Sequence, residues 1–479
     1  MRKIFLSLIS VVALAALVAC GSSNSTPIPS SPSTGNNVGF TNANLHGTYV
    51  FSGNGVNSSN LNFDLVGVFT ADGNGNITSG YRNLYADSTS AALESVTGTY
   101  SVNSDGRGQL QLNGNQAVYR FVMQSPSSAS FFEFSSNADD TGLMKLQSAV
   151  SAPSGTYIVR LQGEDSSGLP YGAIGGLTIS GTSVTGTIDQ NDAGNLAASL
   201  PTTGTLAAPD TTGRGTLQLT FAGAPHNYVY YFVSTSEIVI AGTDGYAVHG
   251  YADLQTTLAG LSGDQVFSLS GAGTSGVLYE TGRFTLTGGA VTNAVEDYLI
   301  GANSAGGYFP GVTFTGSYAA PANGRWTATV GGSLATNLVG WQVSSQQSLV
   351  LAWNSSATVV ETGTMRAQDT SVTTASITGP YSASLSGFNY NDGGYVELGG
   401  NFDASGGSLA GTIDSQTPGF YNTDLASSGN YSIASNGRSP NANVAGVSVV
   451  IYTVDASTAY LISSDATRVY QGKLLAQQP

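Results

Sequence analysis

The chain has 479 residues, of which 14 are basic and 29 acidic; only 9% are charged, against roughly 25% in an ordinary soluble domain. The 41% hydrophobic content supports packed cores, whereas the scarcity of charge argues against coiled coils and exposed helices, and the net charge of −15 argues against nucleic-acid binding. At roughly 100–200 residues per domain, this length predicts several domains.

The first 19 residues have the form of an export signal. Two basic residues precede an apolar run over 4–19, which is shorter than the roughly 20 residues of a membrane-spanning helix and predicts a secretory signal peptide. The run ends in Leu17-Val18-Ala19-Cys20, a motif that resembles the lipobox of bacterial lipoproteins. The resemblance implies cleavage before Cys20 and lipidation of its sulfur, with palmitate among the added chains. The alternative is an ordinary signal peptide with an incidental cysteine.

Cys20 is the only cysteine in the chain, which excludes disulfides and Cys-x-x-Cys metal or redox sites. In the lipoprotein family the residue after the cysteine influences sorting, and Gly21 favours the outer membrane. Ser, Thr, Pro, Asn and Gly dominate residues 20–44, a composition typical of a flexible tether. The N-terminal region therefore predicts a body that a lipid on Cys20 anchors in the cell envelope, in the outer membrane, facing either the periplasm or the outside.

Beyond the tether, five landmarks recur in the same order four times. Among them are a Gly before an aromatic strand near the start of each unit, a Gly-Arg pair beyond its middle, and a Gly followed five residues later by Gln at its end. The spacing of about 108 residues exceeds that of solenoid or propeller repeats, so each unit is expected to be a domain with its own core. The predicted β repeats 1 to 4 span 45–150, 151–257, 258–370 and 375–479.

Apolar and polar residues alternate over short runs within each unit, as in Leu217-Gln218-Leu219-Thr220-Phe221, and turn signals such as Asp105-Gly106 separate the runs. The fold class is therefore all-β, with four tandem antiparallel meander domains. Small eight-stranded barrels, which leave no exposed edge, are favoured, and β-sandwiches are the alternative. For the first unit the predicted strands are 47–53, 62–71, 76–86, 94–102, 107–113, 116–124, 129–135 and 141–147.

The first unit also resembles a repeat found in exported lipoproteins of soil bacteria. The matching segments are GTY at 47–49, FTADGNGNIT at 69–78, GTY at 98–100 and DGRG at 105–108. The resemblance fades in the later units, and it implies an exported repeat protein without implying an activity. The Asp72-Gly-Asn74-Gly-Asn76 part has the alternating oxygen ligands of a calcium loop but lacks the later glutamate, and therefore predicts a hairpin turn.

The Gly-Arg pairs place four of the 14 basic residues at one repeated position. A periodic arginine suits an anionic ligand such as a phosphate or a sugar acid. It also suits a brace, in which the guanidinium donates to turn carbonyls or to a nearby carboxylate. The brace is the favoured interpretation and the anion site the alternative, for Arg107, Arg214, Arg325 and Arg438.

All three tryptophans fall in the third unit. Trp326 and Trp353 lie near apolar positions of the pattern and Trp341 aligns with Phe121, so the pattern predicts that all three fill the core. The alternative is a ligand pocket lined by these side chains inside this one barrel, which makes the third unit the best candidate for small-molecule binding.

No catalytic, metal or cofactor motif is recognised in the chain. A Gly-x-Ser-x-Gly elbow between a strand and a helix is missing, and none of the three histidines has metal-ligand spacing. The local acidic pairs, Asp139-Asp140 and Glu296-Asp297, are interpreted as solvated charges of turns or strand edges. The sequence therefore predicts no enzyme activity, no metal and no cofactor.

These observations predict a lipid-anchored exported protein that presents tandem β domains in a non-catalytic structural, adhesive or interaction role. Its partner at the envelope is expected to be a glycan or a protein, with tandem copies adding reach and multiplying weak binding. The first alternative is small-ligand binding inside the barrels, as in lipocalin-like proteins, or glycan binding on them. An exported hydrolase is the third and weakest hypothesis.

Overall fold

The structure is a computed structural model of the chain and describes residues 38–57, 62–86, 89–90, 93–114, 117–134, 138–245, 247–256, 258, 260–273, 276–301, 307–354, 359–417 and 420–479. The chain divides into two compact units, residues 1–32 and 33–479, and every described residue belongs to the second. The predicted signal peptide and Cys20 lie outside the described residues. No helix within the described ranges is long and apolar enough to cross a membrane.

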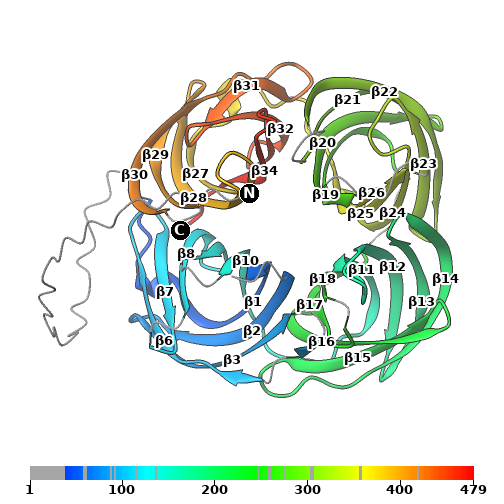
Figure 1. The fold of residues 1–479 in the computed structure, drawn as a ribbon, viewed down its shortest axis with the longest axis horizontal. Helices are drawn as coiled ribbons and strands as arrows, with labels where there is room; N and C mark the ends of the chain where they lie inside the picture. Colours follow the sequence, from blue (N-terminus) through cyan, green and yellow to red (C-terminus); the bar gives the residue numbers. More distant parts are fainter. Residues whose placement is uncertain are drawn as a thin grey trace, which may run out of the picture. The chain divides into compact units, whose positions relative to one another are not determined.

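The described residues form four closed antiparallel β-barrels of eight strands each, in which consecutive strands pair (Figure 1). The prediction of four tandem barrels is therefore confirmed, and the sandwich alternative is wrong. In barrel 1, two additional short strands, β4 (Thr89–Ser90) and β5 (Glu94–Ser95), pair with β3 outside the closed path.

The bounds of the barrel strands are as follows. Barrel 1 contains β1 (His46–Asn57), β2 (Asn62–Asp72), β3 (Asn76–Ala86), β6 (Gly98–Val102), β7 (Arg107–Leu112), β8 (Ala117–Ser125), β9 (Ser128–Glu133) and β10 (Ala138–Leu146). Barrel 2 contains β11 (Gly155–Glu164), β12 (Pro170–Ser180), β13 (Ser183–Asp192), β14 (Asn195–Leu206), β15 (Arg214–Phe221), β16 (Ala224–Ser234), β17 (Glu237–Gly242) and β18 (Ala247–Leu254). Barrel 3 contains β19 (Gly263–Gly273), β20 (Gly276–Thr287), β21 (Ala290–Ile300), β22 (Gly307–Ala322), β23 (Arg325–Gly331), β24 (Asn337–Ser344), β25 (Gln347–Asn354) and β26 (Val359–Ala367). Barrel 4 contains β27 (Gly379–Asn389), β28 (Gly394–Ser405), β29 (Ser408–Thr417), β30 (Phe420–Asn430), β31 (Arg438–Val444), β32 (Val447–Asp455), β33 (Thr458–Ser463) and β34 (Arg468–Ala476).

Each barrel encloses its own apolar core, as the alternation of the strands requires. In β7, for example, Leu110 and Leu112 point into the core of barrel 1, whereas the alternating Gln109 and Gln111 stay partly exposed. The turn at Asp72 is the predicted hairpin between β2 and β3, and its carboxylate accepts hydrogen bonds from the backbone N–H of Asn74 and Asn76. The alternating pattern thus places side chains on the inner and outer faces of every barrel wall.

The segment that precedes a barrel packs into one end of it. Phe40 and Leu45 belong to the core of barrel 1, so the last residues of the segment assigned to the tether are part of the folded body. A Gly-x-Tyr motif at the fourth strand of barrels 1, 3 and 4, at 98–100, 316–318 and 429–431, holds this arrangement, because its tyrosine hydroxyl donates to a carbonyl of the preceding segment. The pairs are Tyr100 with Leu45, Tyr318 with Leu261 and Tyr431 with Ile377.

The barrels contact one another in a closed cycle. A cluster of buried apolar side chains spans barrels 1 and 2, another spans barrels 2 and 3, and a third spans barrels 3 and 4. Barrel 4 then contacts barrel 1, because β27 and β28 lie beside β8 although almost the whole chain separates them (Figure 1). The expectation that tandem copies extend the reach of the protein is therefore wrong, since the last copy returns to the first.

Candidate functional site

The four arginines of the Gly-Arg pairs lie at the four interfaces between barrels. Each is the first residue of the fifth strand of its barrel, in β7, β15, β23 and β31, and its side chain reaches the third strand of the preceding barrel. The side chains that receive them are Asn83 on β3, Asp189 on β13, Asp297 on β21 and Asp414 on β29.

Two of these interfaces contain a bidentate ion pair with a fully buried carboxylate. Arg325 donates through Nε and Nη2 to Asp189, with the shorter distance 2.7 Å, and Arg438 donates in the same way to Asp297 at 2.8 and 2.6 Å. Fork-to-fork pairs of this type are short and directional. Each guanidinium therefore fixes how one barrel sits against its predecessor.

An aromatic side chain beside the arginine donates to the same acceptor. The cross-strand neighbour of Arg325 is Trp341, whose Nε1 donates to Asp189 at 2.8 Å, and the neighbour of Arg438 is Tyr452, whose hydroxyl donates to Asp297. At the interface of barrels 1 and 2 the acceptor is the neutral Asn83, approached by Arg214 and Tyr231.

The interface between barrels 4 and 1 is built differently. Arg107 is almost fully buried and donates to three carboxylates: Asp105 in its own barrel, and Asp414 and Asp424 in barrel 4, at 2.8–2.9 Å. Burial acts to lower the pKa of Arg107, but Asp414 and Asp105 outweigh burial and raise that pKa. Burial raises the pKa of Asp414, an effect that Arg107 partly offsets.

The glutamine that ends each unit reaches the following barrel. Gln147 Nε2 donates to the carbonyls of Thr212 and Phe232, and this close approach explains the glycine before each arginine. Gly213 has a φ of +86°, and a Cβ there would lie 2.3 Å from Gln147 Nε2. The other three terminal glutamines make the same contact with the next barrel: Gln255 of unit 2 with barrel 3, Gln368 of unit 3 with barrel 4, and Gln477 of unit 4 with barrel 1.

The three tryptophans do not share one environment. Trp326 fills the core of barrel 3, as expected, and it occupies space left by Gly340, where a Cβ would lie 2.0 Å from the indole. The alignment of Trp341 with the core residue Phe121 is wrong, because Trp341 belongs to the apolar cluster between barrels 2 and 3, and Trp353 packs against the same cluster. A register difference of one residue moves a side chain to the other face of a strand.

The interpretation of the two acidic pairs as solvated charges is also wrong. Glu296 and Asp297 are both fully buried: Glu296 points into barrel 3, and Asp297 receives Arg438 on the outer face. Asp140 is fully buried as well, and burial, together with Glu133, raises its pKa well above the usual value. Adjacent residues of a strand face opposite sides, so two neighbouring acids serve different surroundings.

Barrel 3 also contains three buried carboxyls that no sequence motif indicated. The Ser333 hydroxyl donates to Glu280 and Glu296, and Glu361 lies next to them. Burial first, and the neighbouring carboxyls second, raise the pKa of Glu280 and Glu361 to about 8, so these side chains are mainly neutral at pH 7. In the described part of the chain, no three His, Cys, Asp or Glu residues form a group that could hold a metal ion.

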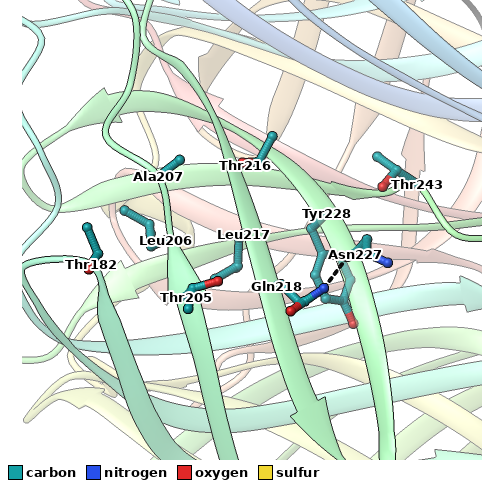
Figure 2. Close-up of a pocket in the computed structure, with 10 residues that line it drawn as sticks. All are labelled: Thr182, Thr205, Leu206, Ala207, Thr216, Leu217, Gln218, Asn227, Tyr228 and Thr243. Carbon is teal, nitrogen blue, oxygen red and sulfur yellow. Dashed lines mark hydrogen bonds between the residues drawn. The ribbon is translucent and has the colours of Figure 1, made fainter.

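A cavity of about 490 Å³ lies on barrel 2, where β14, β15 and β16 meet (Figure 2). Its lining supplies hydroxyl and amide groups and buried apolar side chains, but no carboxylate, imidazole, amine or thiol. Such a lining can bind an uncharged hydroxylated molecule, and it lacks the groups that usually transfer protons near neutral pH. The lining residues are Thr182, Thr205, Leu206, Ala207, Thr216, Leu217, Gln218, Asn227, Tyr228 and Thr243.

The acceptors of the four arginines were missed by the sequence analysis, although a signal for them exists. Each acceptor lies 14 to 16 residues after a glycine that recurs in its unit: Asn83 after Gly67, Asp189 after Gly175, Asp297 after Gly282 and Asp414 after Gly400. An acid or its amide at one repeated position is informative only together with the repeated arginine, because the two partners lie in different units.

Comparison with known proteins gives little further information. No family model and no curated protein matches the chain. A solved structure of intact Ap-TbpB, with N and C lobes, is 8% identical, with 90% of this chain and 94% of that chain covered and a TM-score of 0.19. The isotype 1 transferrin binding protein B from serogroup B Neisseria meningitidis is 10% identical, with 74% and 82% covered and a TM-score of 0.17. TM-scores this low do not establish a common fold.

Proposed function

We propose that this protein is a lipid-anchored, non-catalytic interaction protein of the cell envelope, anchored in the outer membrane through Cys20, and that its four barrels bind a protein or glycan partner as one closed unit. The observation that carries the proposal is the contact between barrels 4 and 1 through Arg107, Asp414 and Gln477. A closed cycle of barrels presents a composite outer surface, which four domains joined only by linkers would not provide.

The packed interiors support surface binding over transport. Large aromatic side chains such as Trp326 and Tyr230 are almost fully buried inside their barrels, so a carrier would have to displace core side chains in order to load a ligand. Truncating a buried Phe or Trp to alanine costs about 3–5 kcal/mol, which indicates how much packing energy such a displacement would give up. Binding at the outer faces and at the junctions has no such cost.

The anchor is tested by comparing the wild type with Cys20→Ser in cell fractionation with labelled palmitate. The wild-type chain is expected in the outer-membrane fraction with label, and Cys20→Ser without label in the soluble fraction. Membrane retention of Cys20→Ser would contradict the anchor.

The interaction role is tested by crosslinking in intact cells that produce either the wild type or Arg107→Ala. A partner that crosslinks to the wild type and is lost from Arg107→Ala, at equal protein levels, supports binding by the closed unit. Equal crosslinking to both would show that a single barrel binds the partner alone.

A second function, glycan binding, is favoured by the cavity on barrel 2. Thr216 lies in its lining, and Thr327 is the equivalent residue of barrel 3, two positions after the repeated arginine. In an oligosaccharide array, Thr216→Val is expected to weaken binding of any retained glycan several-fold, whereas Thr327→Val leaves it unchanged. Equal behaviour of the two variants would exclude this cavity.

A further inference from the structure

Four cationic side chains from the four barrels converge on one place, the cationic centre, which consists of Lys145, Arg160, Arg366 and Lys473. They lie on β10, β11, β26 and β34, which are the last strands of barrels 1, 3 and 4 and the first strand of barrel 2. Contacts across the barrel junctions bring them together. Lys145 pairs with Glu237, and the cross-strand neighbour of Glu237 is Asp253, which accepts from Gln347 Nε2 at 3.3 Å. Gln347 is the cross-strand neighbour of Arg366, and Arg160 stacks on Tyr251, two residues before Asp253. Thr364, two residues before Arg366, is hydrogen-bonded to Tyr460, the cross-strand neighbour of Lys473. In a chain with 14 basic and 29 acidic residues, this gathering is not a consequence of composition.

The carboxylates around the cationic centre do not neutralise it. Glu237 forms an ion pair with Lys145, and Asp455 lies 3.9 Å from Arg366. The third carboxyl, Asp253, is buried, and burial first and Glu237 second raise its pKa to about 7. Asp253 is therefore only partly ionised at neutral pH, and the four cations retain an excess of positive charge.

Two of the four cations lack an acceptor in the described part of the chain. The Lys473 side chain is exposed to solvent, and its ammonium has no hydrogen bond or ion pair there. The guanidinium of Arg160 stacks over the Tyr251 ring at 5.0 Å, and its buried Nε has no hydrogen-bond partner. A buried donor without a partner costs about 1–3 kcal/mol, which a bound acceptor would recover.

Although the Lys473 side chain reaches solvent, the protein packed around it first, and the three neighbouring cations second, lower its pKa. The closed arrangement thus works against charge repulsion at this place, and an anion between the cations would relieve that repulsion. Hydroxyl groups add further donors nearby. The Tyr460 hydroxyl and the Thr364 hydroxyl are hydrogen-bonded to each other at 3.1 Å; Tyr460 is the cross-strand neighbour of Lys473, and Thr364 lies two residues before Arg366 on β26.

We infer that the cationic centre binds a small multivalent oxyanion of the phosphate or pyrophosphate type. Several positive groups from different directions suit an anion with several oxygen acceptors, and a monovalent ion such as chloride could satisfy only part of them. Because each of the four barrels contributes one of the cations, the bound anion would also stabilise the closed cycle. This site is independent of the partner surface in the proposed function.

The test is isothermal titration calorimetry of the full chain with sodium pyrophosphate at low ionic strength, where screening is weak. The wild type is expected to bind one anion per chain. Lys473→Gln removes one charged hydrogen bond and should weaken the affinity about tenfold. Arg366→Gln provides a second variant with the same expected loss.

The matched control is Arg468→Gln, because Arg468 is an exposed cation on the same strand, β34, and its guanidinium lies 4.0 Å from Asp465. This variant should bind pyrophosphate like the wild type. Absence of binding by the wild type, or an equal loss in Lys473→Gln and Arg468→Gln, would overturn the inference. Binding only to vesicles with anionic phospholipid headgroups would also overturn it, since the ligand would then be a membrane surface and not a free anion.

Discussion

The interface that closes the cycle, between barrels 4 and 1, differs in chemistry from the three interfaces whose barrels follow one another in the chain. Each chain-linked interface buries an apolar cluster, such as Val50, Val66 and Tyr85 of barrel 1 against Val229 and Tyr231 of barrel 2. The closing interface adds a concentration of charge, with Arg107 bound by three carboxylates, to an aromatic contact between Phe134 and Tyr421 at 5.2 Å. The arginine and glutamine contacts are repeated four times, but only the closing copy surrounds its arginine with three carboxylates.

The comparison shows how covalent linkage changes what an interface needs. Barrels joined by a short linker stay at high effective concentration, so an apolar cluster with one arginine contact beside it holds them together. The closing interface has only the distant linkage through three other barrels, and it must also reject wrong neighbours. Buried charges serve this purpose, since a partner that lacks the complementary group leaves them unpaired.

The largest effect is expected from Arg107→Ala. This change leaves the buried carboxylates of Asp105 and Asp414 without their cation, which costs about 3–5 kcal/mol. Because no linker joins barrels 4 and 1 directly, the cycle should open at this interface. Small-angle scattering should show an increased radius of gyration, while circular dichroism should retain the β signal of the four intact barrels.

The matched control for this experiment is Arg438→Ala, which removes the equivalent arginine at a chain-linked interface. Its loss of the ion pair with Asp297 should also lower the free energy of unfolding, but the linker and the apolar cluster of barrels 3 and 4 should keep the radius of gyration unchanged. If both variants expand equally, linkage and apolar burial do not distinguish the interfaces.

The second prediction concerns pH at the closing interface. Glu397 of barrel 4 is buried there, and burial first, and then Asp140 and Asp139 of barrel 1, raise its pKa well above the usual value of 4.5. The closed state therefore favours the protonated form. Its stabilising contribution is complete below about pH 4.5 and is lost as the pH rises through the folded pKa.

Glu397→Gln should remove much of this dependence. Because the wild type must bury an ionised carboxylate at alkaline pH, the variant should be more stable than the wild type near about pH 8 and close to it near about pH 5. Urea unfolding from about pH 5 to about pH 9 measures the effect. Glu361→Gln, inside barrel 3, should also flatten the pH dependence, but only Glu397→Gln should protect the compact radius of gyration at alkaline pH.

The fold was predictable because its determinants are local. Alternation and turn residues indicate eight strands in barrel 1, and the observed strands match them closely; one exception is 94–102, which divides into β5 and β6. Two of the wrong placements have one cause. Trp341 and Asp297 both face outward onto another barrel, and a surface that is buried by a different repeat has the same alternation as a surface exposed to water.

The closing contact was not predictable for a related reason. The arginines were found because they repeat, but their acceptors lie in the preceding unit, and for Arg107 the preceding unit is the last one in the chain. Nothing in a linear repeat pattern distinguishes an open series from a closed cycle. The distinction depends on small rotations between successive barrels, which side chains such as Trp341 and Gln255 determine together.

A smaller effect is expected from Gln477→Ala at the closing interface. This change removes the hydrogen bonds from Gln477 Nε2 to the carbonyls of Asp105 and Met123, which are worth about 1–2 kcal/mol together. The result should be a detectable population of opened molecules in scattering. Gln255→Ala, its chain-linked counterpart, should lower the stability without opening the cycle, and opening in both would contradict the comparison.

The smallest effect is expected from Asn83→Asp, which would convert the neutral acceptor of barrel 1 into the acid found at Asp189 and Asp297. Arg214 Nε and the Tyr231 hydroxyl already donate to Asn83, at 3.3 and 3.0 Å. A carboxylate would gain charge-assisted hydrogen bonds, but Asn83 is buried, so desolvation should offset most of the gain and leave a change of at most about 1 kcal/mol.

The reverse change, Asp189→Asn, should cost more, because it leaves Arg325 facing a neutral amide at a site built for a bidentate pair. Urea unfolding of both variants measures the difference. Equal and opposite effects would mean that charge alone sets the strength of these interfaces. A loss without a matching gain would mean that the surrounding donors, and not the charge, decide which acceptor each barrel needs.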